Sequence, residues 1–93
     1  MASFLVAYDL LKDRSAHDYK PLGAELRRLG GHKTQLSLWL VAVSNTAREL
    51  HDHLQGFVDR DDRLWVTEIV RNKYYTSAMS GTNDWLKENP PAR

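Results

Sequence analysis

A single carboxylate near the start of the chain has the type and position that most suggest chemistry. Asp9 lies near the end of the apolar segment 3–10, and strand alternation places it on the face opposite Tyr8. A carboxylate on an otherwise apolar strand face costs free energy unless it gains a partner or the strand end is wet. Two explanations are open: metal binding or catalysis by Asp9, or a structural role in which it caps the following loop or pairs with Lys12 or Arg14. Structural ion pairs produce the same pattern, so spacing alone favours the structural role.

The other residue types that do chemistry form weak patterns. There is no glycine-rich phosphate loop, no GxSxG elbow and no HExxH motif. His51 and His53 are two apart on an expected helix and point about 200° apart, which makes them poor joint metal ligands. The acidic turn 59–62 lacks the glycine and the terminal glutamate of a calcium loop. Ser37 has no adjacent base, and the absence of cysteine excludes disulfides and thiolate chemistry.

The charge balance limits how the chain could bind nucleic acid. The 93 residues carry a formal net charge of +1, so bulk electrostatics does not favour nucleic acid and only a local cluster of cations would. Convergence of two basic clusters in space would make a binding stripe. The candidate clusters are Lys12/Arg14, Arg27/Arg28 with His32/Lys33, and Arg71/Lys73.

The expected elements that position these residues are strands and amphipathic helices in alternation. A strand over 3–10 is followed by a helix that Ser15 or Asp18 caps and Gly30-Gly31 ends. The β-branched and aromatic run 32–43 reads as two short strands, or one bent strand, with the break near 35–37.

The second half of the expected fold repeats this alternation. Thr46 and Glu49 form a capping-box pattern that begins a second helix, and 64–70 is the last clear strand. The order βαββαβ predicts an α+β, ferredoxin-like fold with an antiparallel sheet and both helices on one face. We expect this domain over residues 1–79 and a C-terminal arm over 80–93, in which Trp85-Leu86 packs on the body or on a partner.

The size of the chain and its apolar surface predict self-association. A chain of 93 residues buries roughly 60–65% of its unfolded surface, so its core is thin. The sheet face opposite the helices is too apolar to leave in water, and we expect a homodimer through that face, its edges or the arm. No segment approaches the roughly 20 apolar residues that cross a bilayer, and no secretory signal is visible. The expectation is a cytoplasmic protein that does not bind membranes.

Three short segments carry a resemblance to a known family. They are Tyr8-Asp9, Gln35-Leu36-Ser37-Leu38-Trp39 and Asp62-Arg63-Leu64-Trp65-Val66. Over residues 3–70 the chain resembles the small CRISPR-associated Cas-two nucleases, whose fold VapD-type ribonucleases share. The resemblance implies a ferredoxin-like homodimer that cuts RNA or double-stranded DNA, or that holds DNA for an integrase without catalysis.

The resemblance also implies roles for individual residues. Asp9 would be the catalytic residue and the metal ligand, facing its symmetry mate and binding Mg²⁺ or Mn²⁺. Tyr8, Gln35 and Ser37 would lie nearby and contact the nucleic acid, together with Lys12 and Arg14. The family's arginine-rich stretch after the first strand is reduced here to those two cations, and the tail does not align. Both departures suggest a standalone relative outside a CRISPR context. A nuclease and a non-catalytic binding or assembly module both remain open, as does a small regulatory domain.

Overall fold

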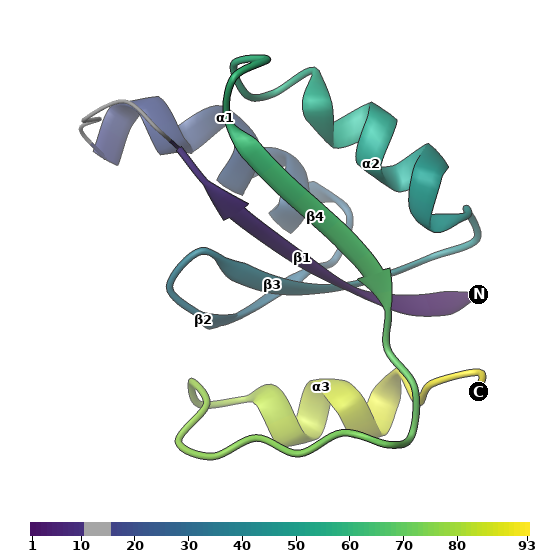
Figure 1. Cartoon of the computed structure of the whole chain (residues 1–93). Coiled ribbons are helices and arrows are strands. Elements are labelled where there is room, and N and C mark those ends of the chain that lie inside the picture. The colour runs from purple at the N-terminus through teal and green to yellow at the C-terminus, as the bar shows by residue number, and fades with distance from the viewer. Residues whose placement is uncertain (11–15) are drawn as a thin grey trace.

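The computed structural model describes residues 1–10 and 16–93 (Figure 1). Within these residues the chain is a small α+β fold of four strands and three helices. The strands form one antiparallel sheet in the order β2-β3-β1-β4. The elements are β1 (Ala2–Asp9), α1 (Ala16–Arg28), β2 (His32–Gln35), β3 (Leu38–Val43), α2 (Ala47–Gln55), β4 (Arg63–Glu68) and α3 (Thr82–Glu88).

One predicted terminus of each long helix is confirmed. The Thr46 side chain accepts a hydrogen bond from the Glu49 backbone, and the Glu49 side chain accepts one from the Thr46 backbone, so the capping box at the start of α2 is confirmed. After α1 the backbone turns at Gly30, whose φ of 78° lies in the left-handed region that glycine tolerates best. Helix α1 begins at Ala16, so the predicted cap at Asp18 is wrong because this residue lies inside the helix, and the cap predicted at Ser15 lies outside the described residues.

The predicted break between the two middle strands is confirmed. Leu36 and Ser37 form a turn between β2 and β3, and an irregularity in strand pairing lies between Lys33 and Gln35. Ser37 has φ of 60°, a left-handed conformation that is uncommon for a residue other than glycine. The turn therefore joins the two strands as a tight hairpin rather than as one bent strand.

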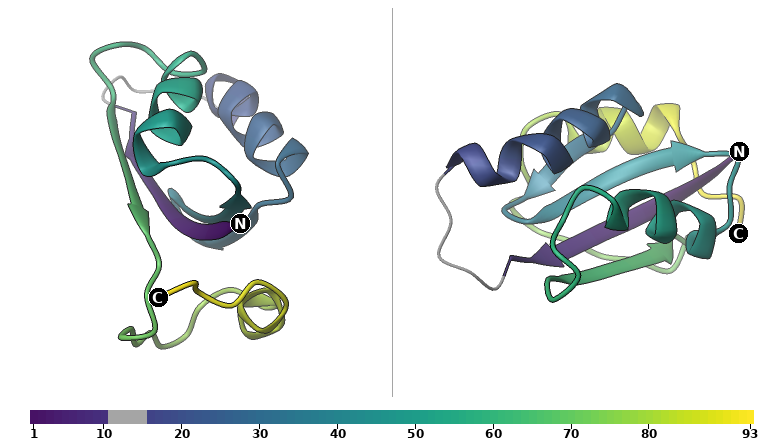
Figure 2. Two further views of the ribbon diagram at one scale, coloured as in Figure 1. Left: turned by 90° about the vertical axis from the view of Figure 1, so that its right-hand side faces the viewer. Right: turned by 90° about the horizontal axis from the view of Figure 1, so that it is seen from above.

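One face of the sheet carries the hydrophobic core, and α1 and α2 cover it (Figure 2). The alternation expected for the first strand is confirmed, because Phe4, Val6 and Tyr8 are buried on this side while Asp9 is exposed. Leucines at helical spacing on α1 and α2 pack onto this sheet face and complete the core. The buried cluster consists of Phe4, Val6, Tyr8, Leu22, Leu26, Trp39, Val41, Leu50 and Leu54.

The opposite face of the sheet is covered in part by the chain's own C-terminal segment and α3 (Figures 1 and 2). The Ile69 N–H donates to the Ser3 carbonyl (2.8 Å), and the Ser3 hydroxyl donates to the Asn89 carbonyl (2.9 Å). Trp85 Nε1 donates to the Gly30 carbonyl (3.2 Å), so the expected docking of Trp85-Leu86 takes place on the body. The helix α3 itself was not expected, because it has only seven residues and no side-chain cap.

Among the described residues, no helix has the length and apolar character needed to cross a bilayer.

Candidate nucleic-acid interface

Asp9 lies at the exposed end of β1 and pairs across the sheet with Arg63 of β4. The two residues are register partners, and Arg63 Nη1 lies 3.9 Å from Asp9 Oδ2. Both side chains are about 70% exposed (71% for Arg63 and 69% for Asp9), and pairs of this kind contribute roughly 0–1 kcal/mol. The structural partners considered from the sequence, Lys12 and Arg14, lie outside the described residues. The carboxylate therefore has a weak partner and ready access to solvent.

Asp9 alone does not make a metal centre. The described part of the chain contains no group of three or more histidine, cysteine or acidic side chains that could hold a metal ion. A magnesium ion prefers six oxygen ligands in octahedral geometry, and one carboxylate supplies at most two. A metal site at Asp9 would therefore need oxygens from water, from substrate or from a second copy of the chain.

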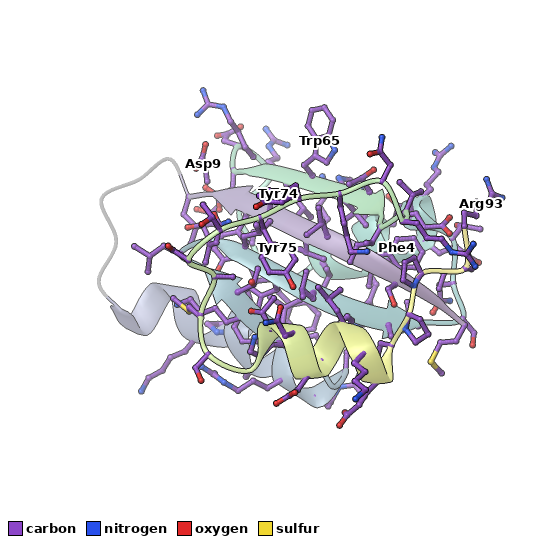
Figure 3. All side chains as sticks on the ribbon, turned by 90° about the horizontal axis from the view of Figure 1, so that it is seen from below. Phe4, Asp9, Trp65, Tyr74, Tyr75 and Arg93 are labelled. Atoms are coloured by element: carbon purple, nitrogen blue, oxygen red, sulfur yellow. The ribbon has the colours of Figure 1, made fainter. Side chains whose placement is uncertain are left out.

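An aromatic side chain, that of Trp65, is exposed near Asp9 (Figure 3). Trp65 pairs with Ala7 in the β1–β4 register, which places it on the same sheet face as Asp9 and Arg63. Its side chain is 71% exposed. This end of the second sheet face therefore combines a carboxylate, a guanidinium and one exposed ring.

A separate groove of about 450 Å³ lies between α1 and the β2–β3 hairpin. Three cations, Lys20, Arg27 and Lys33, line it, and among the described residues around it none carries a carboxylate. A concave site lined by one sign of charge concentrates the local potential and attracts anions. We call this site the basic groove. Its lining residues are Tyr8, Lys20, Gly23, Arg27, Lys33, Leu36, Ser37 and Trp39.

Helical spacing and strand register bring the three cations together. Lys20, Gly23 and Arg27 stand at i, i+3 and i+7 of α1, so they share one face of the helix. A Cβ added at Gly23 would lie 3.4 Å from Arg27 Nη1, so the guanidinium lies close to this face of the helix. Lys33 is the register partner of Trp39, which puts both side chains on the sheet face that α1 covers.

Contacts between elements fix the floor of the basic groove. The Arg27 guanidinium lies over the Trp39 ring, 5.4 Å from its centroid, which is a cation–π distance. Trp39 Nε1 donates to the Tyr8 hydroxyl (3.2 Å), and the Tyr8 N–H donates to the Ser37 carbonyl (3.1 Å). These contacts connect α1, β3, β1 and the hairpin turn, so Arg27 is held in place before any ligand binds.

The structure separates the site residues that the sequence predicted. Tyr8 and Ser37 both line the basic groove. Gln35 instead lines a different cavity, of about 260 Å³, between the second sheet face and the C-terminal segment. Asp9 follows Tyr8 on the strand and so points to the other side of the sheet.

Sequence reasoning missed Lys20 as a groove residue. Its spacing of seven residues from Arg27 was the available signal, because residues so placed share a face of a helix. Arg27 and Lys33 were recognised as parts of one basic cluster, but the sequence did not show that they meet in a concavity. Lys12 and Arg14 lie outside the described residues.

A charged cluster away from both sites connects α1 to α2. Glu25 is buried; Arg28 donates to its two carboxylate oxygens (2.7 and 2.6 Å), and His53 Nε2 lies 2.5 Å from Oε2. The hydrogen bonds to Arg28, followed by the one to His53, lower the pKa of Glu25 from its ordinary 4.5 to about 2. The carboxylate is therefore fully occupied by structural partners, and we assign it to stability.

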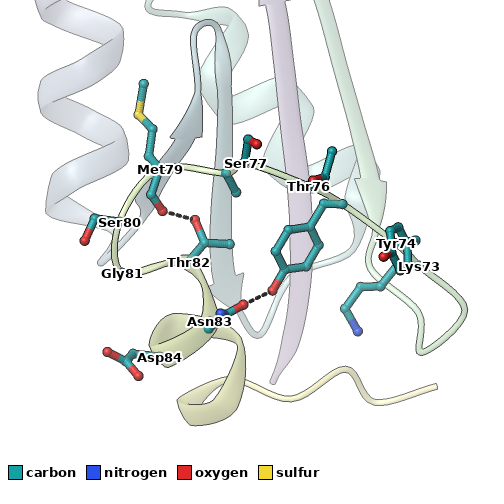
Figure 4. Close-up of a pocket in the computed structure, with 12 residues that line it drawn as sticks. Lys73, Tyr74, Thr76, Ser77, Met79, Ser80, Gly81, Thr82, Asn83 and Asp84 are labelled. Carbon is teal, nitrogen blue, oxygen red and sulfur yellow. Dashed lines mark hydrogen bonds between the residues drawn. The ribbon is translucent and has the colours of Figure 1, made fainter.

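A third cavity, of about 730 Å³, is open to solvent and is lined by the loop 73–84 (Figure 4). Tyr75 donates a hydrogen bond to Asn83, and the Thr82 hydroxyl donates to the Met79 carbonyl (2.7 Å). These bonds shape the loop that leads into α3. Of the described residues that line the cavity, only Lys73 and Asp84 are charged, and their signs are opposite. The cavity has no excess charge that would select a charged ligand.

A comparison of the sequence with protein-family models finds no match.

Proposed function

We propose that this protein binds nucleic acid and acts as a homodimer with a ferredoxin-like fold. The observation that carries the proposal is the convergence of Lys20, Arg27 and Lys33 in the basic groove, without a carboxylate among its described lining residues. The strand order β2-β3-β1-β4, with two helices on one face, is compatible with the ferredoxin-like arrangement.

The chemistry of the groove suits phosphate rather than bases. Cations that neutralise phosphates release counterions, and this supplies most of the sequence-independent affinity for nucleic acid. Trp39 is buried beneath Arg27, so its ring is not available for stacking with a base. Binding here should therefore depend strongly on salt and weakly on sequence.

A binding measurement against salt tests the proposal. The affinity for a labelled single-stranded oligonucleotide should fall as salt rises, and Lys20→Gln with Lys33→Gln should flatten the slope by about 0.7 for each phosphate that the variant no longer neutralises. Arg60→Gln, which removes an exposed cation that neither lines the groove nor belongs to a basic cluster, is the matched control and should leave the slope unchanged. Equal slopes for all three proteins would show that the groove does not bind the backbone.

Metal-dependent phosphodiester hydrolysis at Asp9 is a second candidate function. It is favoured by the exposed position of the Asp9 carboxylate at a strand end, where Arg63 is a weak partner among the described residues. A two-fold axis would bring two such carboxylates together. Without a cation the two like charges would raise at least one pKa. With Mg²⁺ or Mn²⁺ the pair could help to activate water and neutralise charge on a scissile phosphate.

Asp9→Asn separates the two candidates, because it removes the charge and preserves the shape. Wild type and variant are compared on single-stranded RNA, double-stranded RNA and double-stranded DNA, with metal and with chelator. Cleavage by wild type alone, and only with metal, would establish the nuclease. Equal cleavage by both proteins would rule Asp9 out as the catalytic carboxylate. Light scattering on the same samples tests the dimer, and a monomer mass at micromolar concentration would contradict a shared site.

A further inference from the structure

We propose that the basic groove selects a phosphomonoester, namely the terminal phosphate of a nucleic-acid strand, over the internal phosphodiesters. This inference rests on the proposed nucleic-acid binding and names the part of the ligand that the groove recognises. It concerns the face of the molecule opposite Asp9 and does not depend on cleavage there.

The distribution of charge is the first argument. Lys20, Arg27 and Lys33 surround one concavity of about 450 Å³ instead of following one another along an open stripe. Small-ligand pockets commonly have volumes of roughly 300–1,000 Å³. A phosphomonoester carries about −1.5 to −2 charges at neutral pH, whereas each backbone diester carries one. Several cations directed at one place favour the more highly charged group.

Preorganisation of the groove is the second argument. Arg27 lies over the Trp39 ring, and its planar guanidinium can offer two parallel N–H donors to phosphate oxygens. Ser37 lines the same concavity in a left-handed conformation that costs free energy for a residue with a side chain. Sparsely populated backbone conformations of this kind cluster at ligand sites, where the surrounding contacts maintain them.

The lining residues also argue against recognition of a nucleic-acid base within the groove. Among the described lining residues the aromatic ones are Tyr8 and Trp39, which are both buried in the core and hydrogen-bonded to each other. A nucleotide could therefore place its phosphate among the three cations while its base remained outside. Free mononucleotides share this chemistry, so the experiment must separate a strand end from a free nucleotide.

The test compares oligonucleotides of one sequence with a 5′-phosphate, a 3′-phosphate or neither. Fluorescence anisotropy at fixed salt measures the dissociation constant of each. We expect at least one phosphorylated end to bind on the order of tenfold more tightly, which corresponds to about 1.4 kcal/mol. That preference should disappear in Lys20→Gln and Lys33→Gln, and it should persist in the control Arg60→Gln.

The outcomes distinguish this inference from the function on which it rests. Equal salt-dependent affinity for all three oligonucleotides would overturn the preference for a strand end and leave nucleic-acid binding intact. A preference that survives both lysine substitutions would overturn its assignment to the groove. Failure of every oligonucleotide to bind would overturn both proposals. Competition by a mononucleotide as effective as that of the phosphorylated strand would support the phosphomonoester site and identify free nucleotides as its ligands.

Discussion

The two faces of the sheet are covered in physically different ways. On the helical face, leucines of α1 and α2 close a core in which Leu22, Leu26 and Leu54 are almost wholly inaccessible to solvent. On the other face the C-terminal segment leaves a cavity of about 260 Å³ between itself and the strands. Hydrogen bonds hold the C-terminal segment and α3, which we call the cover, against the sheet. Trp65 remains exposed on the same sheet face.

This difference predicts unequal local stability. Close packing around apolar side chains contributes most of the stability of a small domain. A cover with a cavity beneath it and exposed backbone hydrogen bonds opens at a lower free energy than the core. The helical face should therefore determine whether the chain folds, and the C-terminal face should determine which surface the folded chain presents.

Removal of part of the cover should have the largest effect on the free energy of unfolding. Deletion of residues 80–93 should expose Leu40 and Ile69, which are buried on the second face, at a cost of about 2–4 kcal/mol. The remaining chain should still unfold cooperatively, because the helical core is retained. Urea unfolding and binding of an apolar dye measure the two effects. An unchanged midpoint with no added dye binding would show that the cover is dispensable.

A pair of leucine truncations compares the two faces directly. Leu54→Ala in the helical core should cost about 3 kcal/mol, because it loses burial and leaves a cavity that the core cannot fill. Leu86→Ala, beneath the cover, should cost about 1 kcal/mol, since Leu86 is only partly buried and already borders a cavity. Chemical denaturation of both variants gives the two values. Equal losses would contradict the difference between the faces.

A single hydroxyl tests how the cover is attached. Thr82 Oγ1 donates to the Met79 carbonyl and lies 2.8 Å from Thr34 Oγ1 and 3.0 Å from His32 Nε2. Thr82→Val keeps the shape but removes these bonds, and it should cost about 1 kcal/mol. Thr82→Ser keeps the hydroxyl and is the control. Hydrogen exchange should show faster opening of α3 in the valine variant alone, with the helical core unaffected.

The smallest effect on the free energy of unfolding should come from Glu25, between α1 and α2, when the pH is lowered. Because the pKa of Glu25 falls from 4.5 to about 2 on folding, its contribution is complete above pH 4.5 and is lost as the pH falls toward 2. Its partners Arg28 and His53 are largely exposed, and solvent screening limits the size of the effect. Urea unfolding across this range should show a flatter profile for Glu25→Gln, while the exposed control Glu88→Gln should follow wild type.

The features that depend on neighbouring residues were predictable from the sequence. The capping box of Thr46 and Glu49, the alternation along β1 and the left-handed turn at Gly30 all follow from local backbone rules. The break near Ser37 was visible as a run too long for one strand. Each of these features is decided within a few residues, so the amino-acid order suffices to determine it.

Only the tertiary structure decided where the chemical groups meet. Strand register paired Asp9 with Arg63, which lies 54 positions along the sequence. Packing of α1 over the hairpin brought Lys20 and Lys33 into one groove, and the docking of α3 covered part of the sheet face through which dimerisation was expected. Such contacts depend on how separate elements pack to bury their apolar surfaces. No local rule for a short segment contains that information.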